Sequence, residues 1–182
     1  MTLFRRALAL LLALLFPLAA TAALKIAAKN RMRNRPPGRC GWCAVETLAR
    51  HHHFVSLYGL VKNHASRCSA EDLEETLEEC GIAYRIQYPG KRNRRNTDFL
   101  RTAIAKGEGA AVGFRERYQG SGKHIVTLVG WGNKTVRIID SSDRRRRIRV
   151  MSKKRFLSYW DGFALVLERE IPKDQKAHIS AE

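Results

Sequence analysis

The sequence predicts a single α+β domain in which helices come first and a mainly antiparallel sheet follows. Two observations carry this prediction. Apolar residues recur at helical spacing in the first half of the chain, beginning near residue 40. From about residue 82 onwards, short stretches either alternate between apolar and polar residues or are apolar throughout, and turn residues separate them. We therefore expect N-terminal helices packed on a sheet of short, sequentially connected strands.

The first 22 residues have the pattern of a secretory signal peptide. A short basic start, "MTLFRR", precedes the apolar run "ALALLLALLFPLAA", which is too short for an ordinary transmembrane helix. Ala20 and Ala22 supply the small residues of a cleavage site. We expect residues 1–22 to export the chain to the periplasm or out of the cell. An uncleaved membrane anchor is the alternative, and both place the rest of the chain outside the cytoplasm.

The remaining chain is strongly basic. Without residues 1–22 the formal net charge falls from +17 to about +15 over about 160 residues, a length that suits one domain with a proper core. Such a charge attracts polyanions. No nucleic-acid motif accompanies it, and no aromatic residues are interleaved with the basic runs, so we expect no specific nucleic-acid partner. The runs at Lys91–Arg95, Arg115–Arg117 and Arg144–Arg149 instead predict an acidic substrate, an anionic surface or a cell-envelope polymer as the partner.

The helical half of the domain is introduced by a basic segment. Residues 23–38 end in Pro-Pro-Gly, and we interpret them as a linker or an extended arm in front of a domain at 39–170. The first helix is predicted to begin at the first cysteine. "SLYGLVKNHAS" predicts a second short helix or a turn. A third helix follows Ser69, which forms a capping-box pattern with Asp72, and Gly81 ends it.

The second half is predicted to contain most of the strands. "IAYRIQYP" predicts a strand, and "TDFLRTAIAKGEG" a helix with Thr97 as its N-cap. "AAVGF" predicts a short strand, and "HIVTLVGW" and "TVRIID" a hairpin that turns at "GNK". A further strand in "SSDRRRRIRVMS", a short helix in "KKRFLSYWDG" and a last strand, "FALVLERE", complete the domain. The polar tail, residues 171–182, is predicted to be disordered.

The chemistry of the chain is expected to centre on two cysteines, Cys40 and Cys43, at the start of the first helix. A helix N-terminus and a neighbouring imidazole favour a thiolate. A thiol nucleophile also needs a base within hydrogen-bonding reach and a group that orients the base. His124 begins one strand of the predicted hairpin, and Asp140 ends the other.

The register of this hairpin decides whether His124 and Asp140 can meet. If the turn spans residues 132–134, Asp140 lies opposite residue 125, 126 or 127. The middle register places the two side chains on one face as diagonal neighbours, whereas a slip of one residue separates them.

Three stretches of the sequence carry a resemblance to a known family. "NRPPGRCGWCAVETLARHH", "GKHIVTLVGWGNKTVRIIDSSD" and "KKRFLSYWDGFALVLE" resemble the papain-like cysteine peptidases, and most closely the bacteriocin-leader, or double-glycine, peptidase branch. In that branch a Gln precedes a Cys-Gly dipeptide at a helix start, a His begins a strand, and an Asp follows across the hairpin. A Phe, a Trp and a Gly then lead into the last strand, as Phe156, Trp160 and Gly162 do here. The resemblance spans residues 34–168.

This resemblance implies a papain-like fold and a cysteine peptidase that works as a monomer on a peptide or protein substrate, without a cofactor or metal ion. It also bears on which thiol reacts. In the double-glycine branch a Gln six residues before the nucleophile donates to the oxyanion. Asn34 stands at that distance from Cys40, whereas Pro37, which has no donor, stands at that distance from Cys43. In the papain branch the second cysteine of Cys-Gly-x-Cys reacts, so Cys43 stays the alternative nucleophile. The expected catalytic residues are Cys40, His124, Asp140 and Asn34.

Other interpretations of the cysteines stay open. "CGWC" is also typical of thioredoxin-like proteins, which predicts a thiol-disulfide oxidoreductase. If the cysteines are closed in disulfides, the same fold predicts a basic, exported binding protein without catalysis. An exported chain favours disulfides, with Cys68 and Cys80 joined to each other or to one of the first two cysteines. A zinc site is disfavoured because the cysteine spacing is poor and consecutive residues of a helix, such as His51–His53, do not converge on one ion.

Overall fold

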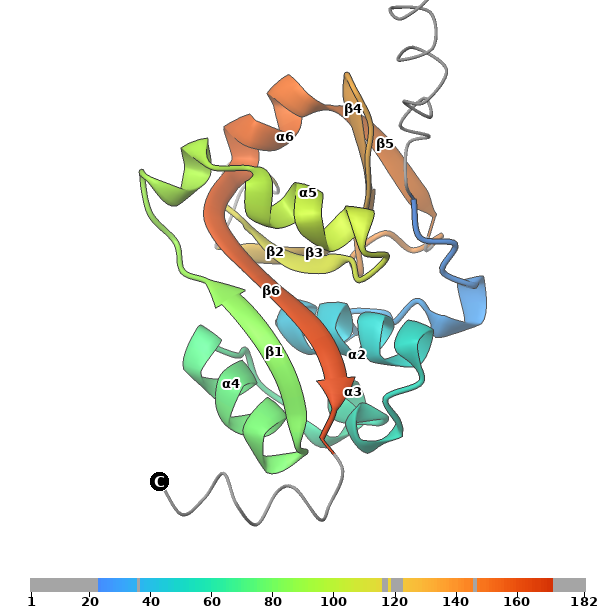
Figure 1. Ribbon diagram of the computed structural model, residues 1–182. Helices are drawn as coiled ribbons and strands as arrows, with labels where there is room; N and C mark the ends of the chain where they lie inside the picture. Colours follow the sequence, from blue (N-terminus) through green and yellow to red (C-terminus); the bar gives the residue numbers. More distant parts are fainter. Residues whose placement is uncertain (1–22, 36, 116–117, 119–122, 146, 172–182) are drawn as a thin grey trace, which may run out of the picture.

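The computed structural model describes residues 23–35, 37–115, 118, 123–145 and 147–171. It contains a six-stranded antiparallel sheet with the strand order β1-β6-β2-β3-β4-β5 (Figure 1). The strands are β1 (Ile82–Gln87), β2 (Ala110–Phe114), β3 (His124–Trp131), β4 (Thr135–Ile139), β5 (Ile148–Ser152) and β6 (Trp160–Glu170). The predicted fold class, helices with a mainly antiparallel sheet, is confirmed.

The helices lie around this sheet, and Figure 1 shows α2 and α5 on either side of β2 and β3. They are α2 (Cys40–His52), α3 (Leu60–Asn63), α4 (Ala70–Glu79), α5 (Asp98–Ala105) and α6 (Lys153–Tyr159), with 3-10 turns η1 (Ala28–Asn30), η2 (Val55–Leu57) and η3 (Asn93–Arg95). Within the described ranges, no helix is long and apolar enough to cross a membrane. The predicted signal peptide, and the predicted tail beyond Ile171, lie outside the described residues.

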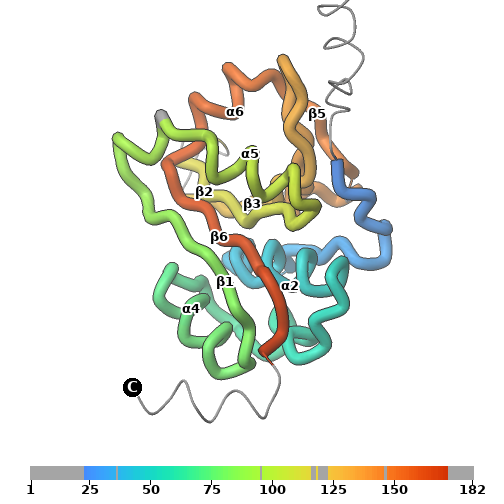
Figure 2. The backbone as a smooth tube through the Cα atoms, in the orientation of Figure 1, coloured from blue at the N-terminus to red at the C-terminus, as the bar shows by residue number. Residues whose placement is uncertain are grey.

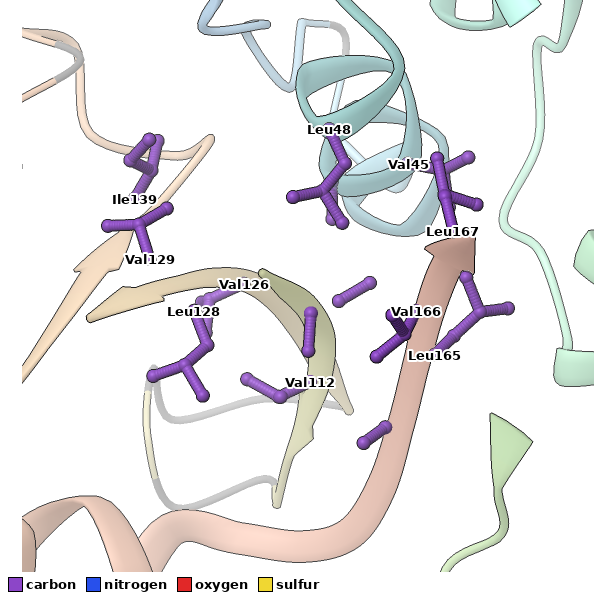
Figure 3. Close-up of a cluster of buried hydrophobic side chains, with 14 of the residues drawn as sticks. Val45, Leu48, Val112, Val126, Leu128, Val129, Ile139, Leu165, Val166 and Leu167 are labelled. Carbon is purple, nitrogen blue, oxygen red and sulfur yellow. The ribbon is translucent and has the colours of Figure 1, made fainter. Parts of the chain in front are cut away.

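Helix α2 is the central helix of the core. All its residues from Gly41 to Ala49 are buried. Figure 3 shows Val45 and Leu48 of this helix facing the apolar side chains of the sheet, including Val126 of β3 and Val166 of β6. Because apolar burial is the main favourable contribution to folding, this packing fixes where α2 begins relative to β3.

Glu46 is a buried carboxylate in the middle of α2. Its oxygens accept hydrogen bonds from the backbone N–H groups of Gly59, at 3.1 Å, and Val61, at 2.8 Å, and it forms an ion pair with Arg50 at 2.7 Å. A buried carboxylate is tolerated only when it is bonded in this way. Glu46 therefore fastens the segment of α3 to α2.

Residues 23–35 form an arm that packs on the domain. The backbone N–H of Leu24 donates to the carbonyl of Val129 at 2.7 Å, and the side chains of Leu24 and Ile26 are buried. In Figure 2 the arm, in blue, runs down one side of the domain and leads into α2. Alternate apolar residues in an otherwise basic stretch allow the arm to bury one face.

Of the two predicted helix N-caps, one forms as expected and the other makes no capping bond. Ser69 and Asp72 form the predicted capping box, with bonds of 2.7 and 3.1 Å. Thr97 precedes α5 as predicted, but its side chain makes no capping bond. The Asn96 side chain accepts from the N–H of Asp98 instead, at 3.0 Å.

The arm should contribute measurably to stability. Replacing Ile26, which is 1% exposed, by alanine should lower the free energy of unfolding by about 2–5 kcal/mol, because the change leaves a cavity in the core. Urea denaturation followed by tryptophan fluorescence measures the change. The exposed neighbour Lys25 provides the control, since Lys25→Ala should alter the same free energy by no more than about 0.5 kcal/mol. Equal stabilities for the two variants would mean that the arm is a linker in solution.

Candidate active site

Cys40 is the first residue of α2 and lines a cavity of about 690 Å³ together with His124. The thiol therefore lies at the positive end of a helix dipole. The backbone N–H groups of Ile125 and Gly41 donate to its sulfur. This position follows from packing, because the buried side of α2 brings its first turn against the start of β3.

The β3–β4 hairpin brings Asp140 next to His124. Thr127 lies opposite Ile139, so continuing the pairing by one residue sets Asp140 opposite residue 126, the middle of the three predicted registers. A β-bulge between residues 128 and 130 produces this alignment by adding one residue to β3. On the turn side of the bulge Gly130 lies opposite Arg137. If that register continued to the end of the strand, Asp140 would lie opposite Thr127, on the other face of the sheet.

The His124 ring connects the thiol to the carboxylate. Its Nε2 lies 2.9 Å from Oδ1 of Asp140, and both side chains are buried. The ring also forms a hydrogen bond with Cys40, which leaves Nδ1 as the nitrogen that faces the sulfur. Burial lowers the pKa of His124, but the bonds to Asp140 and Cys40 outweigh burial and raise it to about 9.

The same contacts stabilise the thiolate. Burial opposes ionisation of Cys40, but the hydrogen bond and positive charge of His124, with the backbone N–H groups, lower its pKa below the ordinary value of 9.0. Burial likewise opposes ionisation of Asp140, and the bond and charge of His124 hold its pKa below the usual range. The site therefore favours a thiolate–imidazolium pair next to an ionised carboxylate.

Two further side chains hold Asp140, and sequence reasoning missed both. The hydroxyl of Tyr118 donates to Oδ2 of Asp140 at 2.9 Å, and its ring stacks on that of His124 with an interplanar angle of 9°. Arg149 forms an ion pair with the same oxygen at 3.4 Å and donates to the Tyr118 hydroxyl at 3.0 Å. Tyr118 lies between two predicted strands in a stretch to which the sequence assigned no role, and Arg149 was interpreted only as part of a basic run.

Asn34 lies at the edge of the same cavity. Its side-chain oxygen accepts from the N–H of Arg39, the N-cap residue of α2, at 2.7 Å, and its own N–H donates to the carbonyl of Ser141 at 3.0 Å. Because the oxygen is engaged, Nδ2 is the donor that the side chain can still offer to a ligand. Asn34 is thus tied both to the helix of Cys40 and to the loop after Asp140.

Cys43, the alternative nucleophile, lies one turn further along α2. Its side chain is completely buried. Burial, followed by the negative charge of Cys40, raises the pKa of its thiol to about 12. The structure therefore brings Cys40, and not Cys43, into contact with His124 and the cavity.

The expected disulfides are not present, because all four cysteines are free thiols. Cys68 precedes the N-cap of α4 and Cys80 is its C-cap, so the ten-residue helix, about 15 Å long, separates them. A disulfide needs Cα atoms within about 7 Å. The proposed link across α4 is therefore wrong on geometric grounds.

One residue of the histidine run 51–53 has a structural role. Nε2 of His52 bonds to the carbonyl of Glu108 at 2.7 Å. Among the described residues, no group of three or more His, Cys, Asp or Glu side chains is arranged to hold a metal ion.

With this geometry in view, the chain was compared with known proteins. No family model matches the sequence, and no curated protein matches it. Solved structures do match. One is a double glycine motif protease from an AMS/PCAT transporter in complex with the leader peptide, with a TM-score of 0.55 and 12% identity over 82% of this chain and 94% of that chain. The chain has a papain-like fold.

Two further papain-like structures match nearly as well. The peptidase domain of Streptococcus ComA, a bifunctional ABC transporter involved in a quorum-sensing pathway, has a TM-score of 0.55 and 19% identity over 76% of this chain and 97% of that chain. The peptidase domain of Streptococcus mutans ComA has a TM-score of 0.51 and 18% identity over 77% and 99%, respectively. The resemblance predicted from the three sequence stretches is thus confirmed for the fold.

The residues of the third stretch have structural roles next to the site. Phe156 and Trp160 are completely buried, and Nε1 of Trp160 donates to the carbonyl of Phe163 at 2.8 Å. Gly162 has a φ of 104°, and a Cβ on it would come within 3.0 Å of the backbone of Gly90. Only a glycine fits there, which explains this residue type near the start of β6.

The ionisation of Cys40 and His124 gives a prediction about the pH dependence of the site. Hydrolysis or transfer by this site should fall as the pH rises through about 9, because His124 then loses its proton. Asp140→Asn should move this alkaline limit to lower pH by at least about one unit, since the carboxylate is the first group that raises the pKa of His124.

NMR titration of the His124 ring measures this pKa without any substrate. Asp143→Asn is the matched control, because the side chain of Asp143 caps the N–H of Arg145 within the same loop. An unchanged His124 titration in the Asp140 variant would contradict the geometry described above.

Proposed function

We propose that the chain is an exported cysteine peptidase in which the Cys40 thiolate attacks the carbonyl carbon of a peptide bond. The observation that carries this proposal is the contact of Cys40 with a His124 ring that Asp140 holds at 2.9 Å, at the edge of an open cavity. Nucleophile, base and orienting group are the three parts that thiol acyl transfer needs. The papain-like fold of peptidase domains supports the same conclusion.

The steps follow from these positions. The thiolate of Cys40 adds to the carbonyl, and the oxyanion that forms receives hydrogen bonds from the N–H of Cys40 and from Nδ2 of Asn34. The His124 imidazolium protonates the leaving amine, and a thioester remains. His124 then removes a proton from water, which hydrolyses the thioester. Asp140 holds the ring in place throughout. An amine in place of water would give transfer instead of hydrolysis with the same residues.

The free cysteines support the enzyme over its rivals. A non-catalytic protein with closed disulfides is disfavoured because all four thiols are free. An oxidoreductase that uses Cys40 and Cys43 is disfavoured because the second thiol is completely buried with a pKa of about 12. No strand leads into Cys40, since a turn at residues 37–38 precedes α2.

We propose a peptide as the substrate. The matching AMS/PCAT protease was solved with a leader peptide bound. The cavity here is lined by the apolar or aromatic side chains of Tyr88, Ile125 and Phe163, and by charged side chains of both signs, Arg67, Lys123, Glu71 and Asp161. This mixture suits an extended peptide that carries both apolar and charged side chains.

A panel of internally quenched peptides tests the activity, one of them with a Gly-Gly pair at its centre. The mature chain should cleave at least one peptide, and Cys40→Ala should reduce the rate about a thousandfold or more. Cys43→Ala is the matched control, because it removes a thiol one turn away and should leave most of the activity. If the Cys43 variant loses activity and the Cys40 variant keeps it, Cys43 is the nucleophile. No cleavage of any peptide by a folded wild-type chain would contradict the proposal.

We also propose that the loop between β4 and β5 attracts an anionic partner, either an acidic part of the substrate or an anionic surface of the cell envelope. Arg144, Arg145, Arg147 and Arg149 surround a hollow of about 630 Å³. Within the described residues, Arg149 forms an ion pair with Asp140, whereas the first three form none. Of the other basic runs, residues 116–117 lie outside the described part of the chain.

Binding to this loop should depend steeply on salt. A fluorescent polyglutamate peptide should bind at low ionic strength, and its Kd should rise about tenfold or more between about 50 and 200 mM salt, as the charges are screened. Changing the three unpaired arginines to glutamine should remove most of this dependence. Binding to vesicles of anionic lipids, but not to vesicles of neutral lipids, would indicate an anionic surface as the partner in place of a peptide. A Kd that changes neither with the salt concentration nor with the substitutions would contradict the proposal.

A further inference from the structure

A third cysteine lies in the candidate site, and the proposed function does not use it. The sulfur of Cys68 packs against the first turn of α2, where a Cβ on Gly41 would come within 2.2 Å of it. The backbone N–H of Trp42 donates to the same sulfur. The glycine after Cys40 is therefore required by the position of Cys68, since any side chain there would displace the sulfur.

Cys68 and Cys40 line the same cavity, and both are half-buried. Their ionisation differs. Burial and then the negative charge of Cys40 raise the pKa of the Cys68 thiol to about 12, whereas the pKa of Cys40 is lowered. The cavity thus holds a reactive thiolate with a protonated thiol beside it. A low-pKa, accessible cysteine next to a second thiol is the arrangement found in reversible thiol oxidation.

We propose that Cys40 is a site of reversible oxidation by peroxides and that Cys68 is its resolving thiol. The Cys40 thiolate attacks one oxygen of hydrogen peroxide, the O–O bond breaks, and the departing hydroxide takes a proton to form water. Cys40 is now a sulfenic acid. The Cys68 sulfur then attacks the Cys40 sulfur, the S–O bond breaks, and the hydroxyl group leaves as water with the proton of Cys68. The disulfide removes the nucleophile until an external thiol reduces it.

The other two cysteines are less suited to this role. Cys43 is completely buried and does not line the cavity. Cys80 is the C-cap of α4, and its sulfur donates to the carbonyl of Ser56 at 3.6 Å, at the far end of that helix. Cys68 lies in the segment between α3 and α4, just before the capping box of Ser69, so the loop can adjust while α4 stays anchored.

The inference shares the Cys40 thiolate with the proposed function and rests on it for its effect on activity. The disulfide itself needs no substrate, so its test is separate. Trypsin places Cys40 and Cys43 in one peptide, Cys40–Arg50, and Cys68 and Cys80 in another, Cys68–Arg85. A bond within either pair leaves a single closed peptide, whereas a bond from Cys40 or Cys43 to Cys68 or Cys80 joins the two peptides, and the cysteine variants below tell these bonds apart.

The reduced mature chain is treated with hydrogen peroxide, blocked with iodoacetamide, digested and analysed by mass spectrometry. The two peptides should appear joined, and dithiothreitol should restore the Cys40 thiol. Cys68→Ser should abolish the joined product and raise the sulfinic and sulfonic forms of Cys40 about tenfold, because no thiol traps the sulfenic acid. Cys43→Ala and Cys80→Ser are the matched controls, and both should keep the joined product. An unoxidised Cys68→Ser sample should alkylate at Cys40 at the wild-type rate, which shows that the site is folded.

Several outcomes would overturn the inference. A closed Cys40–Arg50 peptide would assign the resolving role to Cys43, and loss of the joined product in Cys80→Ser would assign it to Cys80. Equal overoxidation of Cys40 in the wild type and in Cys68→Ser would mean that Cys68 protects nothing. A chain that forms the disulfide but cleaves no peptide would sustain the oxidation site and reject only the peptidase.

Discussion

The pairing of His124 with Asp140 depends on one extra residue in β3. The two side chains come from neighbouring strands, and side chains alternate between the faces of a sheet. The bulge between residues 128 and 130 adds a residue to β3 only, and this places Asp140 on the face of His124. The bond to Asp140, the first of the contacts that raise the pKa of His124, depends on that alignment. The bulge is therefore a structural requirement of the site.

Local signals in the sequence predicted much of this architecture. The capping box of Ser69 and the alternation in β1 act within a few residues, so they can be found without knowing the fold. His124 and Asp140 were found because a short hairpin limits their register to three choices. The bulge that selects among them is not encoded by a recognisable local pattern, since Leu128, Val129 and Gly130 also fit a regular strand.

The residues that escaped prediction act through long-range contacts. Tyr118 and Arg149 reach Asp140 from separate segments, and neither the residues around Tyr118 nor the basic run around Arg149 indicated this locally. The position of Cys68 depends on how α4 and α2 pack, and the number of cysteines in a chain expected to be exported favoured disulfides instead. The burial of Leu24 and Ile26 was not predicted, because basic neighbours dominate the composition of the arm. Burial of a few side chains outweighs the average character of a segment.

The arm also has a mechanical consequence. It pairs with β3 near Gly130, at the end of the strand away from His124, and only later reaches Asn34 and the start of α2. A pull on the chain at Ala23 would first load this bridge and the hydrogen bond between Leu24 and Val129. Asn34, which would donate to the oxyanion, lies behind that attachment. A force applied at Ala23 would therefore reach this attachment before it reaches the candidate active site.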